Sequence, residues 1–173
     1  VEVTDLNVGR AISWPKGHSG IQDMSRAAER IFVGELVKSE PHPEHPDRFS
    51  LQTMRVKEAI KGTIAAGDEI VVVQVVPLLD EHEHEDDHVH DEHHGHKSGI
   101  EGVALFEKGI EYLLFVEESG SDPGWWNIMG GVQGRAEIVN GRLVTLLPES
   151  PMGMEFHGRT VEEMQQTIYD SLR

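Results

Sequence analysis

The chain has 173 residues and no cysteine, which excludes disulfides, zinc–thiolate sites and thiol catalysis. Its apolar runs are all too short for a transmembrane helix, so we expect no membrane span in the visible chain. Basic residues are scarce, since 15 Lys and Arg stand against 31 Asp and Glu, for a formal net charge of −16. A surface that binds nucleic acid needs clustered positive charge, and the Lys and Arg residues here are scattered. We therefore expect no nucleic-acid partner.

Histidine and acidic residues are concentrated in one segment. Asp80–His96 reads DEHEHEDDHVHDEHHGH, in which only Val89 and Gly95 are not His, Asp or Glu. Such a segment cannot bury apolar surface, so we expect it to form a solvated loop. Imidazole and carboxylate oxygen are both good ligands for Zn²⁺, and nickel or copper are the alternatives. The predicted ligands, with no fixed set of four, are His82, His84, His88, His90, His93, His94, His96, Asp86, Asp87 and Asp91.

This segment has two interpretations besides metal capture. His84-Glu85-Asp86-Asp87-His88 matches the HExxH pattern of zinc peptidases, in which two His bind the metal and the Glu is the general base. That match is almost inevitable in a run of His, Asp and Glu, and a zinc peptidase embeds the motif in a helix with apolar neighbours. We therefore predict no enzymatic activity. The remaining alternative is an acidic loop that binds no metal.

The rest of the chain has the pattern of a mainly β protein with added helices. Residues 21–30 have apolar or small residues at helical spacing, and alternating or β-branched runs follow. A capping box at Thr160 and Glu163 opens a C-terminal helix over Thr160–Arg173, and Pro148–Gly158 before it is expected to be irregular. The expected strands are Ile31–Ser39, Phe49–Ile60, Glu69–Val76, Ile110–Glu117, Trp125–Val132, Arg135–Val139 and Arg142–Leu147, the last two joined by a turn at Asn140-Gly141.

Four segments together resemble one family. They are AERIFVGELVKS (28–39), MRVKEAIKGTIAAGDEIVVV (54–73), GVALFEKGIEYLLFV (102–116) and WNIMGGVQGRAEIVNGRL (126–143). They are similar to bacterial extracytoplasmic domains of the netrin-like, metalloproteinase-inhibitor-like type. The resemblance implies an OB-fold-like five-stranded barrel, a short helix before the first strand, an amphipathic C-terminal helix, and a secreted, cell-surface or periplasmic location. The absence of an initiator Met before Val1 fits a removed leader.

The resemblance does not extend to the chemistry of the animal inhibitors. Those proteins chelate a protease zinc through an N-terminal Cys, and this chain has none. The acidic His segment is also foreign to the family pattern, although its composition is similar to the loops of zinc transporters and periplasmic zinc-binding proteins. The expected organisation is therefore an irregular arm (1–20), a barrel (21–147) with a loop inserted at 80–97, and a linker with a C-terminal helix packed on the barrel (148–173).

Two hypotheses for the function follow. The first is an extracytoplasmic module that captures or buffers divalent metal through the inserted loop. The second is a module that binds another envelope or secreted protein, with the loop either incidental or a metal-dependent switch.

A few other residues are candidates for a site. His42 and His45 are expected to be exposed surface residues rather than extra ligands, and His18 and His157 to be ordinary surface or packing residues. Trp125-Trp126 is expected to pack in or at the rim of the core, with stacking on a sugar or a base as the alternative.

Overall fold

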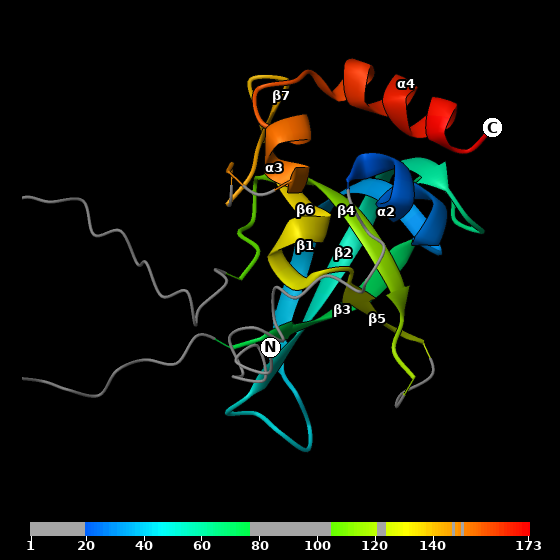
Figure 1. Ribbon diagram of the computed structural model, residues 1–173. Coiled ribbons are helices and arrows are strands. Elements are labelled where there is room, and N and C mark those ends of the chain that lie inside the picture. Colours follow the sequence, from blue (N-terminus) through cyan, green and yellow to red (C-terminus); the bar gives the residue numbers. More distant parts are fainter. Residues whose placement is uncertain (1–19, 77–104, 121–123, 147, 150) are drawn as a thin grey trace, which may run out of the picture.

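The computed structural model describes residues 20–76, 105–120, 124–146, 148–149 and 151–173. In this part of the chain, short helices stand at both ends of a run of strands (Figure 1). The elements are α2 (Ile21–Ala27), β1 (Arg30–Pro41), β2 (Phe49–Lys61), β3 (Glu69–Val75), β4 (Glu111–Glu118), β5 (Trp125–Ile128), a 3₁₀ turn η2 (Gly131–Gly134), β6 (Arg135–Val139), β7 (Arg142–Val144), α3 (Pro151–Phe156) and α4 (Val161–Ser171). The predicted mainly β class is confirmed.

Five of the strands close into a ring. The sheet order is β1-β2-β3-β5-β4-β6-β7, and an additional pairing between β1 and β4 joins the first five strands end to end. Within the ring β3 and β5 run parallel, and every other pairing is antiparallel. Strands β6 and β7 extend the sheet outward from β4.

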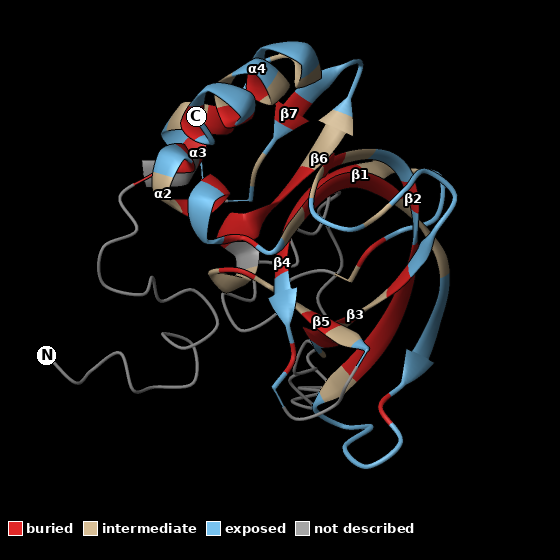
Figure 2. Cartoon of the chain, turned by 90° about the vertical axis from the view of Figure 1, so that its right-hand side faces the viewer, coloured by how far each residue is buried: buried red, intermediate tan, exposed pale blue. Residues whose placement is uncertain are grey.

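Alternation along each strand divides the buried residues between two cores, because successive side chains point to opposite faces. In β1, Phe32 points into the ring, where it packs with a cluster that includes Met54, Val72 and Leu114. Its neighbours Ile31 and Val33 belong to a second cluster, which the helices share. That outer core contains Ile21, Met24, Ala28, Ile31, Val33, Ile60, Leu113, Phe115, Met129, Ala136, Leu143, Phe156, Met164 and Ile168. The buried strand residues appear red in Figure 2, beneath the helices.

Contacts distant in sequence hold the helices in place. Glu155 of α3 accepts a 2.5 Å hydrogen bond from the backbone N–H of Ile21, the first residue of α2. The first turn of α4 is closed as the capping box predicts, because the Thr160 hydroxyl accepts a 3.2 Å hydrogen bond from the N–H of Glu163. Met164 and Ile168 of α4 are fully buried in the outer core, so the C-terminal helix packs on the ring as predicted.

The structure corrects three boundaries. The prediction that Pro148–Gly158 is irregular was wrong, because Pro151–Phe156 forms α3. The strand expected over Trp125–Val132 ends at Ile128, since Gly130 and Gly131 both have a φ of 61° and turn the chain into η2. The last strand stops at Val144 rather than Leu147.

The hairpin before that strand is confirmed. Asn140 and Gly141 have φ values of 52° and 75°, as the central residues of a tight two-residue turn require. In the described ranges, no helix is long and apolar enough to cross a membrane.

Candidate functional site

The predicted metal ligands, His82 to His96, all lie within residues 77–104 and therefore outside the described residues. The HExxH match at 84–88, His18 and residues 1–19 of the expected N-terminal arm (1–20) lie outside them as well. Among the residues that are described, no group of three or more His, Asp or Glu side chains is arranged to hold a metal ion. The structure does define the two points where the ring meets the 77–104 segment.

These two points lie side by side at one end of β3. The side-chain oxygen of Gln74 accepts a 3.4 Å hydrogen bond from the backbone N–H of Phe106. On the other side of β3, the N–H of Val76 donates to the carbonyl oxygen of Arg48 at 2.8 Å. The chain therefore leaves the ring after Val76 and is back beside it at Phe106.

The returning chain is anchored by a buried cation among aromatic rings. The guanidinium carbon of Arg135 lies 4.4 Å from the Phe106 ring centroid, and that ring is 4.6 Å from the ring of Tyr112. The Tyr112 hydroxyl oxygen accepts a 2.9 Å hydrogen bond from the N–H of Glu107. Burial lowers the pKa of Arg135 to about 10 and raises the pKa of Tyr112. At neutral pH the site therefore contains a protonated Arg and a neutral Tyr.

His42 differs from its prediction because it is buried, whereas His45 is exposed as expected. The Nδ1 atom of His42 accepts hydrogen bonds of 3.1 Å from the N–H groups of both Glu44 and His45. Its ring also lies 5.2 Å from the ring of Trp125. His42 thus organises the turn between β1 and β2, with its Nδ1 lone pair occupied by backbone donors. His157 is exposed, as expected of a surface residue.

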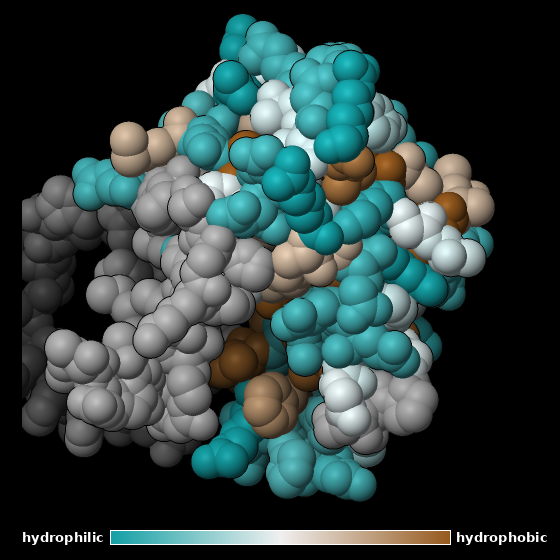
Figure 3. Space-filling model, turned by 45° about the vertical axis from the view of Figure 1, so that its right-hand side comes forward, coloured by the Kyte–Doolittle hydropathy of each residue, from teal (hydrophilic) through white to brown (hydrophobic). Residues whose placement is uncertain are grey.

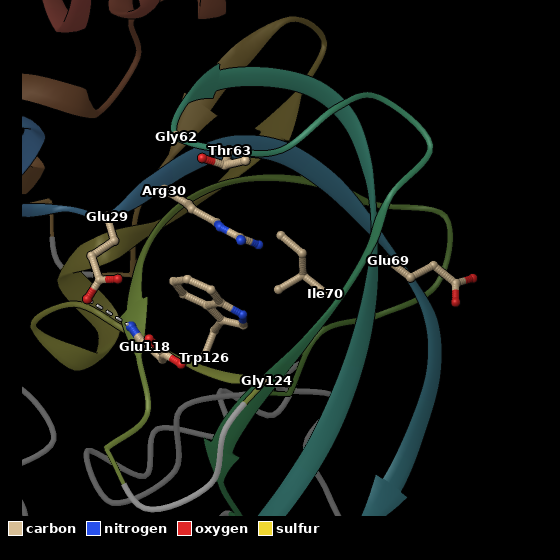
Figure 4. A pocket seen from close by; sticks show the side chains of 9 residues that line it. All are labelled: Glu29, Arg30, Gly62, Thr63, Glu69, Ile70, Glu118, Gly124 and Trp126. Carbon is tan, nitrogen blue, oxygen red and sulfur yellow. Dashed lines mark hydrogen bonds between the residues drawn. The ribbon is translucent and has the colours of Figure 1, made fainter.

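A pocket of about 560 Å³ lies at the other end of β3, which we call the mouth pocket. Its residues come from the start of β1, the turn between β2 and β3, the start of β3, the end of β4 and the start of β5 (Figure 4). They are Glu29, Arg30, Gly62, Thr63, Glu69, Ile70, Glu118, Gly124 and Trp126. The mouth of a strand ring is a common place for small-molecule sites, and this volume lies within their usual range.

The alternation of side chains along the strands determines which residues point into the mouth pocket. Arg30 stands two residues before the inward-facing Phe32, and Ile70 stands two before the inward-facing Val72, so both point into the ring. Trp126 is also buried in the inner core. The guanidinium carbon of Arg30 lies 4.1 Å from the centroid of the Trp126 ring, which is a cation–π contact. The predicted packing of Trp126 in the core is confirmed, while Trp125 is half-buried against His42.

The acidic residues of the mouth pocket differ in the contacts that they make. Glu69 forms an ion pair of 3.7 Å with Arg55, and its carboxylate points away from the other side chains drawn in Figure 4. Glu29 accepts a 3.3 Å hydrogen bond from the backbone N–H of Glu118. Both Glu29 and Glu118 are exposed at the rim. The mouth pocket therefore combines one cation over an aromatic floor with acids along one edge.

Hydrophilic residues cover most of the face shown in Figure 3, and apolar residues appear there in small separate areas. Large exposed apolar side chains in the described part are Val75, Val139, Val144, Leu146, Met154, Tyr169 and Leu172.

No family model matches the chain, and no curated protein matches it.

Sequence reasoning missed the mouth pocket. The pairing of Arg30 with Trp126 joins residues far apart in the chain, and neither stands in a recognisable motif. The one usable signal was the position of Arg30, which places a charged residue at the alternating positions that Phe32 and Leu36 also occupy.

Proposed function

We propose that this protein is an extracytoplasmic metal-binding module that captures or buffers a divalent ion, zinc first, through the His, Asp and Glu residues of Asp80–His96. The observation that carries this proposal is the composition of the segment, in which nearly every side chain is a metal ligand. Metal capture of this kind needs several ligands within reach of one ion and no particular register, so it does not depend on one set of four residues.

The architecture around the insertion supports a modular role. Gln74 and Phe106 are joined by a hydrogen bond, and Phe106 is anchored by Arg135 and Tyr112. The chain leaves and re-enters the ring at adjacent points. The length and sequence of the segment between those points can therefore change while the ring stays intact. The metal ligands and the hydrophobic cores are thus separate parts of the sequence.

The ring itself is proposed to be an OB-type barrel of the netrin-like kind. The circular order β1-β2-β3-β5-β4 and the parallel β3–β5 pair support that assignment, since this fold is a five-stranded Greek-key barrel. The extracytoplasmic location belongs to the same proposal and is supported by the sequence resemblance alone.

Calorimetric titration tests the metal proposal. Zn²⁺, Ni²⁺ and Cu²⁺ are titrated into the intact chain and into a chain that lacks residues 80–96, and native mass spectrometry gives the stoichiometry. We expect the intact chain to bind zinc and the deleted chain to lose that binding with an unchanged circular dichroism spectrum. A matched control replaces the seven His of the segment by Asn and keeps its acids. Failure of the intact chain to bind any of these ions below millimolar concentration contradicts the proposal.

A protein-interaction module is the second candidate, with the inserted segment either incidental or a metal-dependent switch. It predicts a partner that still binds after deletion of residues 80–96, or one that binds only with metal present. A zinc peptidase acting through His84, Glu85 and His88 is not expected. Hydrolysis of a peptide library in the presence of zinc, abolished by Glu85→Gln, would overturn that expectation.

A further inference from the structure

We propose that the mouth pocket binds a small zwitterion, an α-amino acid with an apolar side chain. In this arrangement Arg30 holds the carboxylate, Trp126 and Ile70 contact the side chain, and the rim acid Glu118 faces the ammonium group. The proposal is independent of metal capture, because the mouth pocket and the base of the insertion lie at opposite ends of β3.

Among the described residues, the guanidinium of Arg30 meets no hydrogen-bond acceptor. Its guanidinium face lies over Trp126, but no hydrogen bond or ion pair joins its side chain to the described residues. A guanidinium carries five N–H donors in a planar fork that matches the two oxygens of a carboxylate. Stacking on the indole fixes the plane of that fork, which reduces the entropy lost when a ligand binds.

The guanidinium of Arg30 lies beside two apolar side chains of the mouth pocket. Figure 4 shows Arg30 reaching across the mouth pocket, with its guanidinium between the Trp126 indole and Ile70. Ile70 is 3 % exposed and Trp126 is 9 % exposed, so both form the floor of the mouth pocket rather than its rim. A ligand carboxylate on Arg30 therefore sits next to apolar surface, which suits a ligand with an apolar group attached close to its carboxylate.

The rim of the mouth pocket carries negative charge. Glu118 and Glu29 stand on the same edge, and the carboxylate of Glu29 is engaged with the N–H of Glu118. A simple anion would be repelled by these acids, whereas a ligand that carries a positive charge beside its carboxylate is attracted by them. An α-amino acid has both charges at the required short separation.

Ligand discrimination gives the first test, made on the full chain. L-leucine is titrated into ¹⁵N-labelled protein, and in parallel L-leucinamide, which lacks the carboxylate, and N-acetyl-L-leucine, which lacks the ammonium group. We expect chemical-shift changes at Arg30, Ile70 and the Trp126 indole N–H with leucine, and affinities at least about tenfold weaker for both analogues. The absence of shifts at millimolar leucine, or equal binding of either analogue, overturns the proposal.

Substitutions give the second test. Arg30→Lys keeps the charge and removes the fork, so we expect leucine affinity to fall about tenfold or more. Glu118→Gln should weaken leucine and leave N-acetyl-leucine unchanged, because only leucine carries the ammonium group. The matched controls are Arg48→Lys, in the hairpin between β1 and β2, and Glu117→Gln, the neighbour of Glu118 on β4; both should bind leucine like the wild type. Wild-type affinity in Glu118→Gln overturns the proposal even if Arg30→Lys does not fold.

Discussion

Lys61 donates a 2.6 Å hydrogen bond from its Nζ atom to the carbonyl oxygen of Ala28, the C-cap residue of α2. The same ammonium also donates to the carbonyl oxygens of Ser25 and Arg26, at 2.9 and 3.0 Å. One side chain at the end of β2 thus satisfies three carbonyls at the C-terminus of a seven-residue helix. Burial lowers the pKa of Lys61, yet the helix end favours a positive charge.

Lys61→Met should lower the free energy of unfolding by about 1–2 kcal/mol, because the three carbonyls lose a charged donor. Urea denaturation at neutral pH measures the change. Lys57→Met is the matched control, since Lys57 forms a solvent-accessible 3.6 Å ion pair with Glu35 and its loss should change stability by less than about 0.5 kcal/mol. Equal effects of the two substitutions would contradict the role assigned to Lys61.

Glu155→Gln should destabilise α2 selectively. The N-cap residue of α2 is Gly20, which has no side chain, and the Glu155 carboxylate accepts the N–H of Ile21 in its place. We expect a loss of about 0.5–2 kcal/mol and faster hydrogen exchange at the amides of residues 21–24. Glu162→Gln, in the exposed first turn of α4, removes the same charge without touching α2. Unchanged exchange in α2 would show that Glu155 does not cap it.

Phe156→Ala should be among the most destabilising substitutions in the chain, with a loss of about 3–5 kcal/mol. Phe156 is fully buried, and its ring stacks on that of Phe115 with centroids 5.6 Å apart. Met154→Ala in the same helix is the comparison, because Met154 is 75 % exposed and its loss should cost less than about 0.5 kcal/mol. Thermal unfolding of the two variants separates these outcomes, and a small effect at Phe156 would place α3 outside the cooperative core.

His42→Phe should cost about 1–3 kcal/mol, since the N–H groups of Glu44 and His45 both lose their acceptor. His45→Phe changes an exposed ring on the same turn and should be nearly neutral. Urea denaturation of both variants is the measurement. If they behave alike, the turn does not depend on the Nδ1 atom of His42.

Zinc affinity of the intact chain should fall by about tenfold or more between about pH 7.5 and about pH 5.5, because imidazole must be unprotonated to bind metal. Protons and metal compete for the same nitrogen atoms, so the fall should be larger than for a chain whose seven His in Asp80–His96 are Asn. Calorimetry in two buffers of different ionisation enthalpy also counts the protons released. If zinc affinity does not change with pH, the ligands are the carboxylates and not the imidazoles.

Local signals were enough to predict most of the secondary structure. Alternation and β-branched residues located the strands, Thr160 with Glu163 located the start of α4, and Asn140-Gly141 located a hairpin. These features depend on neighbours in the sequence, which is why pattern reasoning succeeds with them.

The errors have a common cause in tertiary structure. The segment PMGMEF contains Pro and Gly and has little intrinsic helix preference, yet it is helical because Phe156 is drawn into the core beside Phe115. Likewise the cap of α2 by Glu155 joins positions 134 residues apart, and the contact of Arg30 with Trp126 depends on closure of the strand ring. Local spacing does not identify the partner in any of these contacts.

The hydrogen bond between Gln74 and Phe106 also has a consequence for the segment between them. Because it fixes the two ends of the intervening segment, doubling the length of that segment should add only about 0.6 kcal/mol of closure entropy. Residues can therefore be added to or removed from this segment at little cost to the stability of the ring. Under the proposed metal-binding function, the number of ligands can change without any change in the ring.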